Sequence, residues 1–398
     1  MIYGFYFKFL QLTRSKFLSV ILSYIVRFLF VCKYFIERFR CKKKIINISH
    51  NQAIETVRSV HPDIDSQYER VNLDVDDNVD LSIIVPIYNY VGLIEQNILS
   101  ILNQHTKYNF ELILVDDGST DGAQDIVKKY TTNPSVKAIF QKNQGIAGAR
   151  NTGINNAVGK YVMFVDCDDV VNDNIVETLM DKAYQENSDI VMCGHNLVKE
   201  KNGEVYSSIQ NVYPDYNLLG YYGNAKILNY PGLPWAKVYK RELFNQVRYL
   251  PGYWYEDTII HSLIFTQCKS FSYVPVVAYQ YRWYENNFSH TQGNNTNPKC
   301  IDRYWMLVKI LKLYKQINGD LNNECFYTML ITHLSVHYYP SLMGLDEEVI
   351  ESLFSLACDL YFEYKPKYQC KLPYMLKIVE KALTDRNINL WKLAIKYL

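Results

Sequence analysis

Residues 161–169 are Tyr161-Val-Met-Phe-Val-Asp166-Cys167-Asp168-Asp169, an apolar run of strand length that leads straight into three carboxylates. A carboxylate at the edge of a packed sheet is poorly solvated, so acids there need a reason. Asp166 and Asp168, two residues apart at the carboxyl end of a strand, offer hard oxygen ligands suited to Mg²⁺ or Mn²⁺. Ligands of open α/β sheets bind at that end of the strands. The alternative is a helix start, with Asp168 or Asp169 as an acidic cap.

The composition predicts a folded chain with a real core. Of its residues, 48% are hydrophobic and 21% are charged, as in a globular protein. The length of 398 residues is enough for two or three structural units. Nine cysteines are scattered without any Cys-x-x-Cys pair. Their odd number and irregular spacing fit free thiols in a reducing compartment better than a disulfide framework.

The net charge of +1 hides a strongly basic amino-terminal segment. Residues 1–44 contain ten Lys or Arg and a single acid, Glu37, so this segment carries about +9 and the remainder about −8. A basic arm on a mildly acidic body predicts an anionic partner surface. Nucleic-acid binding is not expected, because the basic residues are mixed with long aliphatic ones rather than with polar linkers.

The same segment contains the apolar residues 17–26 and 28–32, which Arg27 and Lys33 interrupt. A transmembrane helix needs about 20 largely apolar residues, and no small-residue cleavage site follows that would indicate a signal peptide. A helix lying in the membrane interface, with aromatics inserted and lysines on lipid phosphates, fits best. A transmembrane helix and a soluble packing or oligomer helix remain open.

From Leu81 onward, strands alternate with helices, which predicts parallel βαβ units. Residues 45–80 are expected to be a solvated connector. Buried strands are expected over 81–87, 110–115, 136–141 and 161–165, with helices over 91–104, 121–130, 145–158 and 175–186. A strand near 189–193, a turn at Asn202-Gly203 and helices near 218–229, 241–247 and 259–265 follow. Helices over 303–316, 323–338 and 347–363 and an amphipathic, basic stretch over 373–398 complete the expected elements.

Polar residues close three of the four predicted strands. Pro86-Ile87-Tyr88-Asn89 ends the first, Asp116-Asp117-Gly118-Ser119 the second and Asp166-Cys167-Asp168 the fourth. Because these ends meet at one edge of a parallel sheet, an aromatic ring, a carboxylate and a metal-binding pair come together, as a nucleotide pocket requires. Arg150 follows the third strand and can add a guanidinium to a phosphate, or it only pairs with Asp117 or Asp168. Gly145-Ile-Ala-Gly148 lacks the Gly-x-Gly-x-x-Gly spacing of a nicotinamide-cofactor site.

These motifs together resemble the family 2 glycosyltransferases of the bacterial surface-polysaccharide type, which have the GT-A fold. The similarity lies in Ser-Ile-Ile-Val-Pro-Ile-Tyr-Asn, Leu-Val-Asp-Asp-Gly-Ser-Thr-Asp, Ala-Arg-Asn-Thr-Gly-Ile and Phe-Val-Asp-Cys-Asp-Asp, in that order. It is specific over residues 80–185 and extends to about residue 295. It does not cover residues 1–75, and it leaves 298–398 unassigned.

The resemblance implies a role for each motif residue of the donor site. Pro86 and Tyr88 would hold the base, Tyr88 by stacking, and Asp117 would bond its edge. Asp166 would face the ribose and the metal, and Asp168 would hold Mn²⁺ or Mg²⁺ against the diphosphate. The resemblance also places Arg150 on the nucleotide side, with Arg282 and Ser289 closing over the diphosphate. Plain structural roles remain open: Tyr88 as a wall aromatic, Asp117 as a turn former, and His290 as a surface histidine rather than a ligand.

The second half of the domain is expected to hold the acceptor. Tyr255-Glu256-Asp257-Thr258 resembles the family's Glu-Asp motif, which makes Asp257 the catalytic base and Glu256 an acceptor-side residue. The alternative for Asp257 is an acidic helix start. Pro234-Trp235-Ala236-Lys237 resembles an acceptor-lining segment, so Trp235 and Lys237 are expected to contact the acceptor, although Trp235 also suits a core.

The resulting prediction is an α/β chain with the GT-A fold, meaning a Rossmann-like, mostly parallel sheet with an acceptor-side subdomain, plus a C-terminal helical region and an N-terminal basic apolar helix. The expected parts are a membrane-associating segment (1–45), a connector (46–80), the catalytic domain (81–297, divided at 185/186 into nucleotide-sugar and acceptor halves) and the helical region (298–398).

The expected activity is inverting, metal-dependent glycosyl transfer of the hexosyltransferase type. The donor is expected to be a nucleotide diphosphate sugar, UDP-linked by preference, and the acceptor a saccharide or a lipid-linked molecule. The expected location is the cytoplasmic face of the cell membrane, held peripherally or by one N-terminal anchor, with an oligomer left open. Rivals are a nucleotidyltransferase, which would need a Gly- and Arg-rich phosphate loop after the first strand, and a catalytically silent nucleotide-sugar-binding or scaffold protein on the same fold.

Overall fold

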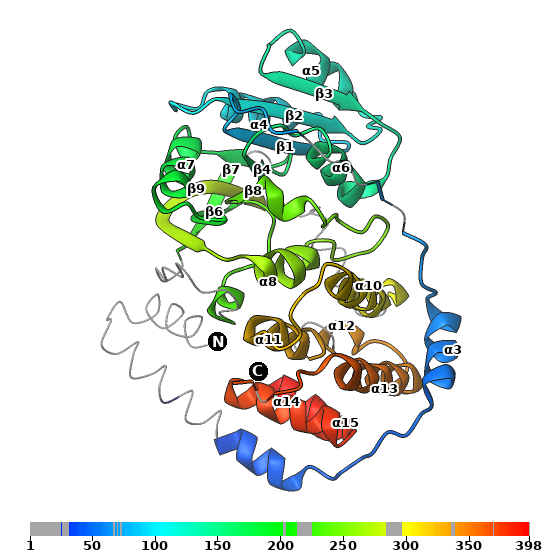
Figure 1. Ribbon diagram of the computed structural model, residues 1–398. Helices are drawn as coiled ribbons and strands as arrows, with labels where there is room; N and C mark the ends of the chain where they lie inside the picture. The colour runs from blue at the N-terminus through cyan, green and yellow to red at the C-terminus, as the bar shows by residue number, and fades with distance from the viewer. Residues whose placement is uncertain are drawn as a thin grey trace. The chain divides into compact units, whose positions relative to one another are not determined.

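The computed structural model describes residues 25, 32–66, 68–69, 71, 74–201, 204–212, 225–283, 297–335, 339–368 and 370–397. The chain divides into two compact units (Figure 1). The sheet unit comprises Val60–Leu330 and Tyr364–Cys370, and the helical unit comprises Met1–Ser59, Ile331–Glu363 and Lys371–Leu398.

The first half of the sheet unit confirms the expected alternation of strands and helices. Its elements are β1 (Leu81–Ile87), α4 (Ile94–Leu102), β2 (Phe110–Asp116), α5 (Ala123–Tyr130), β3 (Val136–Phe140), α6 (Gly145–Ile154), β4 (Tyr161–Phe164) and α7 (Ile175–Glu186). The strands β3, β2, β1 and β4 are parallel neighbours in that order. In the register, Ile87 stands opposite Asp116 and Ile84 opposite Phe164, so the polar strand ends share one edge.

The remaining strands extend the sheet on the far side of β4. They are β5 (Val170–Val171), β6 (Ile190–Lys201), β7 (Glu204–Asn211), β8 (Lys237–Lys240) and β9 (Phe271–Trp283). Within the described residues, the order is β3-β2-β1-β4-β8-β6-β9-β5, and β7 pairs with β6. β8 is antiparallel to both neighbours, whereas β6 and β9 are parallel. The sheet is therefore mixed, and its first half, β3-β2-β1-β4, is parallel throughout.

Alternate residues of β1 pack on opposite faces of the sheet, as a period of two requires. Ile83, Val85 and Ile87 belong to a core that includes residues of α4 and α7. Ile84 meets α6 instead: a Cβ at Gly153 would lie 2.2 Å from Ile84 Cγ2, so only glycine lets α6 approach this closely. Helices therefore cover both faces, giving the three layers of a doubly wound fold.

Three expected elements of the second half differ from the structure. Strand β6 runs to Lys201 rather than ending at Cys193, residues 241–247 form only a short 3-10 helix (Arg241–Phe244), and residues 259–265 are mainly a π-helix (Ile260–Ile264) that leads into α8 (Phe265–Gln267). Strand β9 was not expected, because Pro275 interrupts its pattern. The register shows why the strand tolerates it: Cys193 pairs with Val274 and Gly194 with Val277, so Pro275 lies in a bulge.

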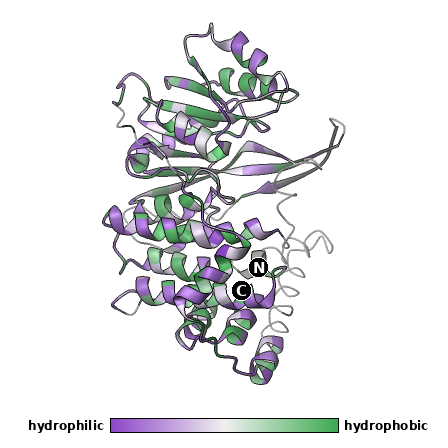
Figure 2. Ribbon diagram, turned by 90° about the vertical axis from the view of Figure 1, so that its right-hand side faces the viewer, coloured by the Kyte–Doolittle hydropathy of each residue, from purple (hydrophilic) through white to green (hydrophobic). Residues whose placement is uncertain are grey.

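The carboxyl-terminal helices confirm the expected helical region. They are α10 (Asp302–Gln316), α11 (Glu324–His333), α12 (Tyr339–Leu342), α13 (Glu347–Tyr364), α14 (Tyr374–Thr384) and α15 (Ile388–Lys396). In the helical unit, the Trp391 ring lies 5.0 Å from that of Phe354, and its Nε1–H donates to the Leu334 carbonyl at 2.9 Å. Figure 2 shows hydrophilic and hydrophobic stripes along these helices, as expected for packed amphipathic helices.

The helical unit also contains α3 (His50–Val60) and helical residues 32–40. α3 lies inside the expected connector, 46–80, and α10 belongs to the sheet unit rather than to a separate region beginning at 298. Among the described residues, no helix has both the length and the apolar character needed to cross a membrane. Residues 1–24 and 26–31, the turn at 202–203, Ser289 and His290 lie outside the described residues.

Candidate active site

The loop after β4 is held from behind by Asn97 of α4. Its Nδ2 donates to the carbonyls of Asp166 (2.9 Å) and Asp169 (2.7 Å), and Asn97 is fully buried. Two hydrogen bonds from one buried amide fix the path of the loop. The backbone that carries the Asp166 and Asp168 side chains is therefore held in one conformation.

Tyr279 of β9 holds the same loop from the other side. The Asp166 N–H donates to the Tyr279 hydroxyl (3.2 Å), which donates to Asp169 Oδ2 (2.6 Å). Burial raises the pKa of both Asp169 and Tyr279 well above the usual values. Asp169, fully buried, also accepts from the Arg282 N–H at 2.9 Å. Asp169 is thus a structural acid, whereas Asp166 and Asp168 are only partly buried.

A cavity of about 520 Å³ opens beside this loop. Seven residues expected in the donor, metal, acceptor or catalytic roles line it together: Pro86, Arg150, Asp166, Asp168, Trp235, Glu256 and Asp257. They come from the ends of β1 and β4, from α6, and from segments more than 60 residues further along the chain. The fold therefore gathers the strand-end acids and the predicted base around one space.

Arg150 of α6 connects the two halves of the site. Its guanidinium bonds Asp166 Oδ1 and Glu256 Oε1, each at 2.9 Å, so it pairs with neither Asp117 nor Asp168. Burial lowers the pKa of Arg150, but the charges of Asp166 and Glu256 outweigh burial and hold the pKa above its usual range. A permanently charged, buried arginine fixes the distance between the strand end and the Glu-Asp segment.

Asp257 lies at the start of the helical turn that leads into the π-helix. The preceding Tyr255 has φ of 65°, a strained conformation for a non-glycine residue, and its ring stacks on the Arg303 guanidinium at 3.6 Å. Burial, followed by repulsion from Glu256, raises the pKa of Asp257 to about 6. Among the described residues, no hydrogen bond to its carboxyl group is formed. A carboxylate of this pKa can accept a proton at neutral pH.

Aromatic rings form the wall of the cavity on the side where the acceptor is expected. The Trp235 ring stacks against Tyr279 (4.8 Å, 11°) and Tyr281 (5.4 Å, 10°), and His195 meets it edge-on at 4.9 Å. Burial, followed by the charge of Lys237, lowers the pKa of His195 to about 4, so His195 is neutral at pH 7. Trp235 thus takes part in the packed core and lines the cavity as well.

Lys237 does not line the cavity. Its buried ammonium donates to the carbonyls of Leu233 (2.7 Å) and Trp235 (3.4 Å), and burial lowers its pKa to about 7. Ala236, which lies between Trp235 and Lys237, has a positive φ of 56°. Lys237 therefore fixes the turn that presents Trp235, and its expected contact with the acceptor stays a prediction.

Four expected donor residues lie apart from this cavity or outside the described part of the chain. Asp117 is buried, and its Oδ1 accepts from Gln141 Nε2 (2.7 Å) and the Gln144 N–H (2.9 Å); burial raises its pKa. Tyr88 is 47% exposed at the end of β1. Arg282 is buried against the Asp168 carbonyl, and Ser289 is not described.

The residues present fit a divalent cation held jointly with a substrate. Among the described residues, no three His, Cys, Asp or Glu side chains form a complete metal cluster. Mg²⁺ and similar ions need only one or two carboxylates when a diphosphate supplies the other oxygens. Asp166 and Asp168 supply these, and four acids around one buried Arg150 would repel a diphosphate unless a cation lay between.

Comparison with known proteins assigns this chain to a family. The model of glycosyl transferase family 2 matches residues 82–248. The glycosyltransferase YibD of Escherichia coli, itself uncharacterized, is 30% identical over 254 residues, which are 60% of this chain and 71% of YibD. The chain belongs to glycosyltransferase family 2. This family 2 glycosyltransferase is also 32% identical to GlyA of Streptococcus pneumoniae over 217 residues, 52% of the chain but only 31% of GlyA.

A solved structure is similar over most of the chain. The S. aureus TarS fragment in complex with UDP aligns with a TM-score of 0.52 at 18% identity, covering 80% of this chain and 90% of the fragment. At that identity the likeness shows the fold alone. It confirms the expected GT-A fold for this family 2 glycosyltransferase.

Sequence reasoning missed the supporting aromatic residues of β9. Tyr279, Tyr281 and Trp283 alternate at the spacing of a strand, which is a usable signal. The roles of Asn97 and His195 had no local signal, because each acts through residues distant in the chain.

Proposed function

We propose that this glycosyltransferase transfers one hexose from a UDP-linked donor to a hydroxyl group of a saccharide or lipid-linked acceptor, with inversion at the anomeric carbon. The observation that carries the proposal is that Asp166, Asp168 and Asp257 line one cavity of about 520 Å³. The complex of TarS with UDP, a protein of the same fold, supports the choice of nucleotide.

Asp257 is the group that removes the acceptor proton. As the acceptor oxygen attacks the anomeric carbon, the new carbon–oxygen bond forms, the bond to the diphosphate breaks, and the hydroxyl proton passes to the Asp257 carboxylate. A single base on the side opposite the leaving group produces inversion. Glu256, held by Arg150 at 2.9 Å, lies beside Asp257 and, after burial, contributes to the raised pKa of the proposed base.

Asp168 and Asp166 would hold Mn²⁺ or Mg²⁺, which supplies electrostatic stabilisation for the departing diphosphate. Arg150 keeps Asp166 oriented through their 2.9 Å ion pair. Trp235 and the neighbouring rings shield the reacting centre from water, so that the acceptor hydroxyl competes successfully as nucleophile.

The proposed setting is the cytoplasmic face of a bacterial membrane, in the assembly of surface polysaccharides. Support comes from the basic, apolar residues 1–44 and from the resemblance of the motifs to enzymes of that type.

A thermal-shift panel tests the donor and metal together. UDP, GDP and their common hexose conjugates would each be added with Mn²⁺ and with EDTA. We expect UDP compounds to raise Tm with Mn²⁺ and to lose the effect with EDTA or in Asp168→Asn. Asp173→Asn, an exposed acid four residues after Asp169, is the matched control. A full UDP-dependent shift in EDTA would refute the metal assignment, and binding without any transfer product would favour a silent binding protein.

A further inference from the structure

Helical residues 32–40 of the helical unit have one face packed and one face open. Tyr34 is buried, and its ring packs edge-on against the ring of Tyr397, just after α15, with 5.4 Å between the ring centroids. Phe35, Ile36 and Phe39 are 55%, 54% and 93% exposed. Positions 35 and 39 are neighbours on a helix surface, with 36 beside them, so the three side chains form one apolar patch.

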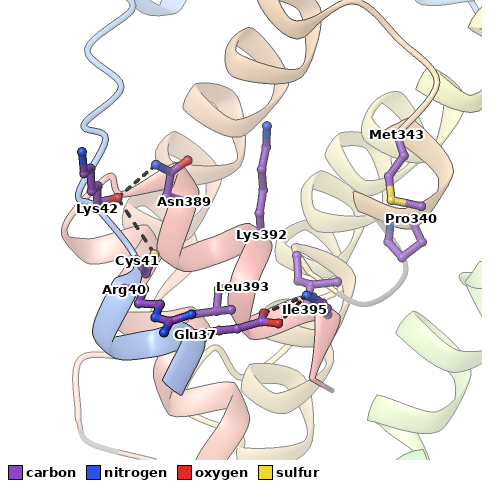
Figure 3. A pocket seen from close by; sticks show the side chains of 11 residues that line it. Glu37, Arg40, Cys41, Lys42, Pro340, Met343, Asn389, Lys392, Leu393 and Ile395 are labelled. Carbon is purple, nitrogen blue, oxygen red and sulfur yellow. Dashed lines mark hydrogen bonds and ion pairs between the residues drawn. The ribbon is translucent and has the colours of Figure 1, made fainter. Parts of the chain in front are cut away.

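The end of the same helical segment borders a pocket of about 690 Å³, which lies between residues 37–42, α15 and the segment of Pro340 and Met343 (Figure 3). Its structure is fixed by the chain itself: Asn389 Nδ2 donates to the Lys42 carbonyl at 3.0 Å, and Lys396 pairs with Glu37 at 2.7 Å. The pocket walls are mainly apolar, with Met343 exposed among them.

The rim of the pocket carries excess positive charge. Four basic residues line it against a single acid, Glu37. Lys396 is paired with Glu37, and Lys392 with Glu347 at 2.8 Å. In the described part of the chain, no acid lies within 4.0 Å of Arg40 or Lys42, both of which are exposed. Two uncompensated cations therefore stand next to three exposed apolar side chains.

We propose that this surface, formed by Phe35, Ile36, Phe39, Arg40 and Lys42, binds the headgroup layer of an anionic phospholipid bilayer. The apolar side chains would enter the boundary between headgroups and acyl chains, while Arg40 and Lys42 bind phosphates at the pocket rim. The residue pattern fits a bilayer better than nucleic acid, because the phosphate backbone of a nucleic acid offers no apolar layer that could bury the three exposed apolar side chains. The basic, apolar residues that precede 32 continue the same chemistry in sequence.

This inference deepens the proposed membrane association and is independent of the transfer chemistry. It assigns part of the membrane contact to the packed helical unit rather than to residues 1–31 alone. The experiment must distinguish binding to a bilayer from two alternatives. One is binding of a free phosphate ion to the cations, and the other is binding of a second copy of the chain to the apolar patch.

Vesicle flotation of the full chain tests the proposal. Parent protein would be mixed with vesicles of pure phosphatidylcholine or of phosphatidylcholine and phosphatidylglycerol at about 70:30. Each cation near an anionic surface contributes about fivefold to partitioning. We therefore expect Arg40→Glu/Lys42→Glu to weaken binding to the anionic vesicles at least tenfold, and Phe39→Asp to weaken it on both compositions. The matched control is Lys128→Glu/Lys129→Glu on α5 of the sheet unit, where both lysines are exposed.

Parent-like flotation of both test variants would overturn the proposal, whatever residues 1–31 contribute. So would loss of parent binding on addition of millimolar phosphate, which would indicate a free-ion site, or a patch-dependent dimer in gel filtration that does not float. Circular dichroism and Tm confirm that the variants fold. Hydrolysis of UDP-sugar without acceptor reports the active site separately, so a failure of the proposed enzyme function would be distinguished from a failure of membrane binding.

Discussion

Replacing Asp257 with Asn should abolish transfer and yet stabilise the protein. The Asp257 carboxyl has a pKa of about 6 in the folded chain, against about 3.9 in an unfolded one. The folded state therefore binds this proton more tightly than the unfolded state does. The protonated carboxyl contributes its full share to the free energy of unfolding below about pH 4, and this contribution is lost as pH rises through about 6. At pH 7.5 the ionised carboxylate destabilises the fold.

The magnitude follows from the same two pKa values. A difference of about two pH units corresponds to at most about 3 kcal/mol. Because the Asp257 side chain is partly exposed, solvent screening reduces this to about 1–2 kcal/mol. The free energy of unfolding should thus rise by that amount in Asp257→Asn, with a Tm increase of about 2–4 °C for a unit of this size. Transfer should fall by about 10²–10⁴-fold, while the UDP-dependent thermal shift is retained.

The assays are differential scanning calorimetry at pH 7.5 and pH 5, and initial rates from pH 5 to 9. Parent kcat should fall as pH drops through about 6, because the base must be ionised. The stabilisation by Asn should shrink at pH 5. If Asp257 were only an acidic helix start, Asn would cost about 0.3–1 kcal/mol instead. A lower Tm together with near-parent turnover would refute the catalytic assignment. Asp125→Asn, in the first turn of α5 and 79% exposed, is the control that should show the helix-start behaviour together with the loss of one exposed ion pair, to Lys128 at 3.0 Å.

Two further substitutions test how the site is held. Arg150→Met leaves the Asp166 and Glu256 carboxylates without their shared partner, so the free energy of unfolding in urea titrations should fall by about 2–4 kcal/mol. The control is Lys137→Met at an exposed position, which should change it little. Stability equal to that of the parent would mean that the ion pairs of Arg150 contribute nothing. Gly153→Ala places a Cβ 2.2 Å from Ile84 and should cost about 1–3 kcal/mol by chemical denaturation, while Gly92→Ala, whose Cβ meets nothing within 4 Å, should not. An unchanged Gly153→Ala midpoint would show that α6 can shift freely on the sheet.

The nucleotide half of the fold could be predicted because its signals are local. Each strand from 81 to 165 is a short, largely apolar run, and three of the four end at polar motifs whose position in a parallel sheet is fixed by topology. The acids Asp166 and Asp168 therefore came together with the predicted base, as the resemblance implied. Helix α7 has the bounds that its pattern predicted, Ile175–Glu186.

The acceptor half could not be predicted as well, because its structure depends on contacts between distant residues. Strand β9 is hidden by Pro275, which only a bulge opposite Gly194 accommodates. The partners of Arg150 lie 16 and 106 residues away, and nothing near Arg150 in the sequence selects them. The strained backbone of Tyr255 is likewise imposed by packing around it and not by its own preference.

The bond between Asp166 and Tyr279 joins residues that leave the ribosome 113 positions apart. A nascent chain that has reached residue 250 already contains the strand-end acids, but it lacks the tyrosine that fixes their loop and the aspartate that we propose as the base. Pairings of such long range form late in folding. The pocket therefore cannot be complete until β9 has been synthesised, so a chain that ends before Tyr279 is expected to lack both the fixed loop and any activity that depends on it.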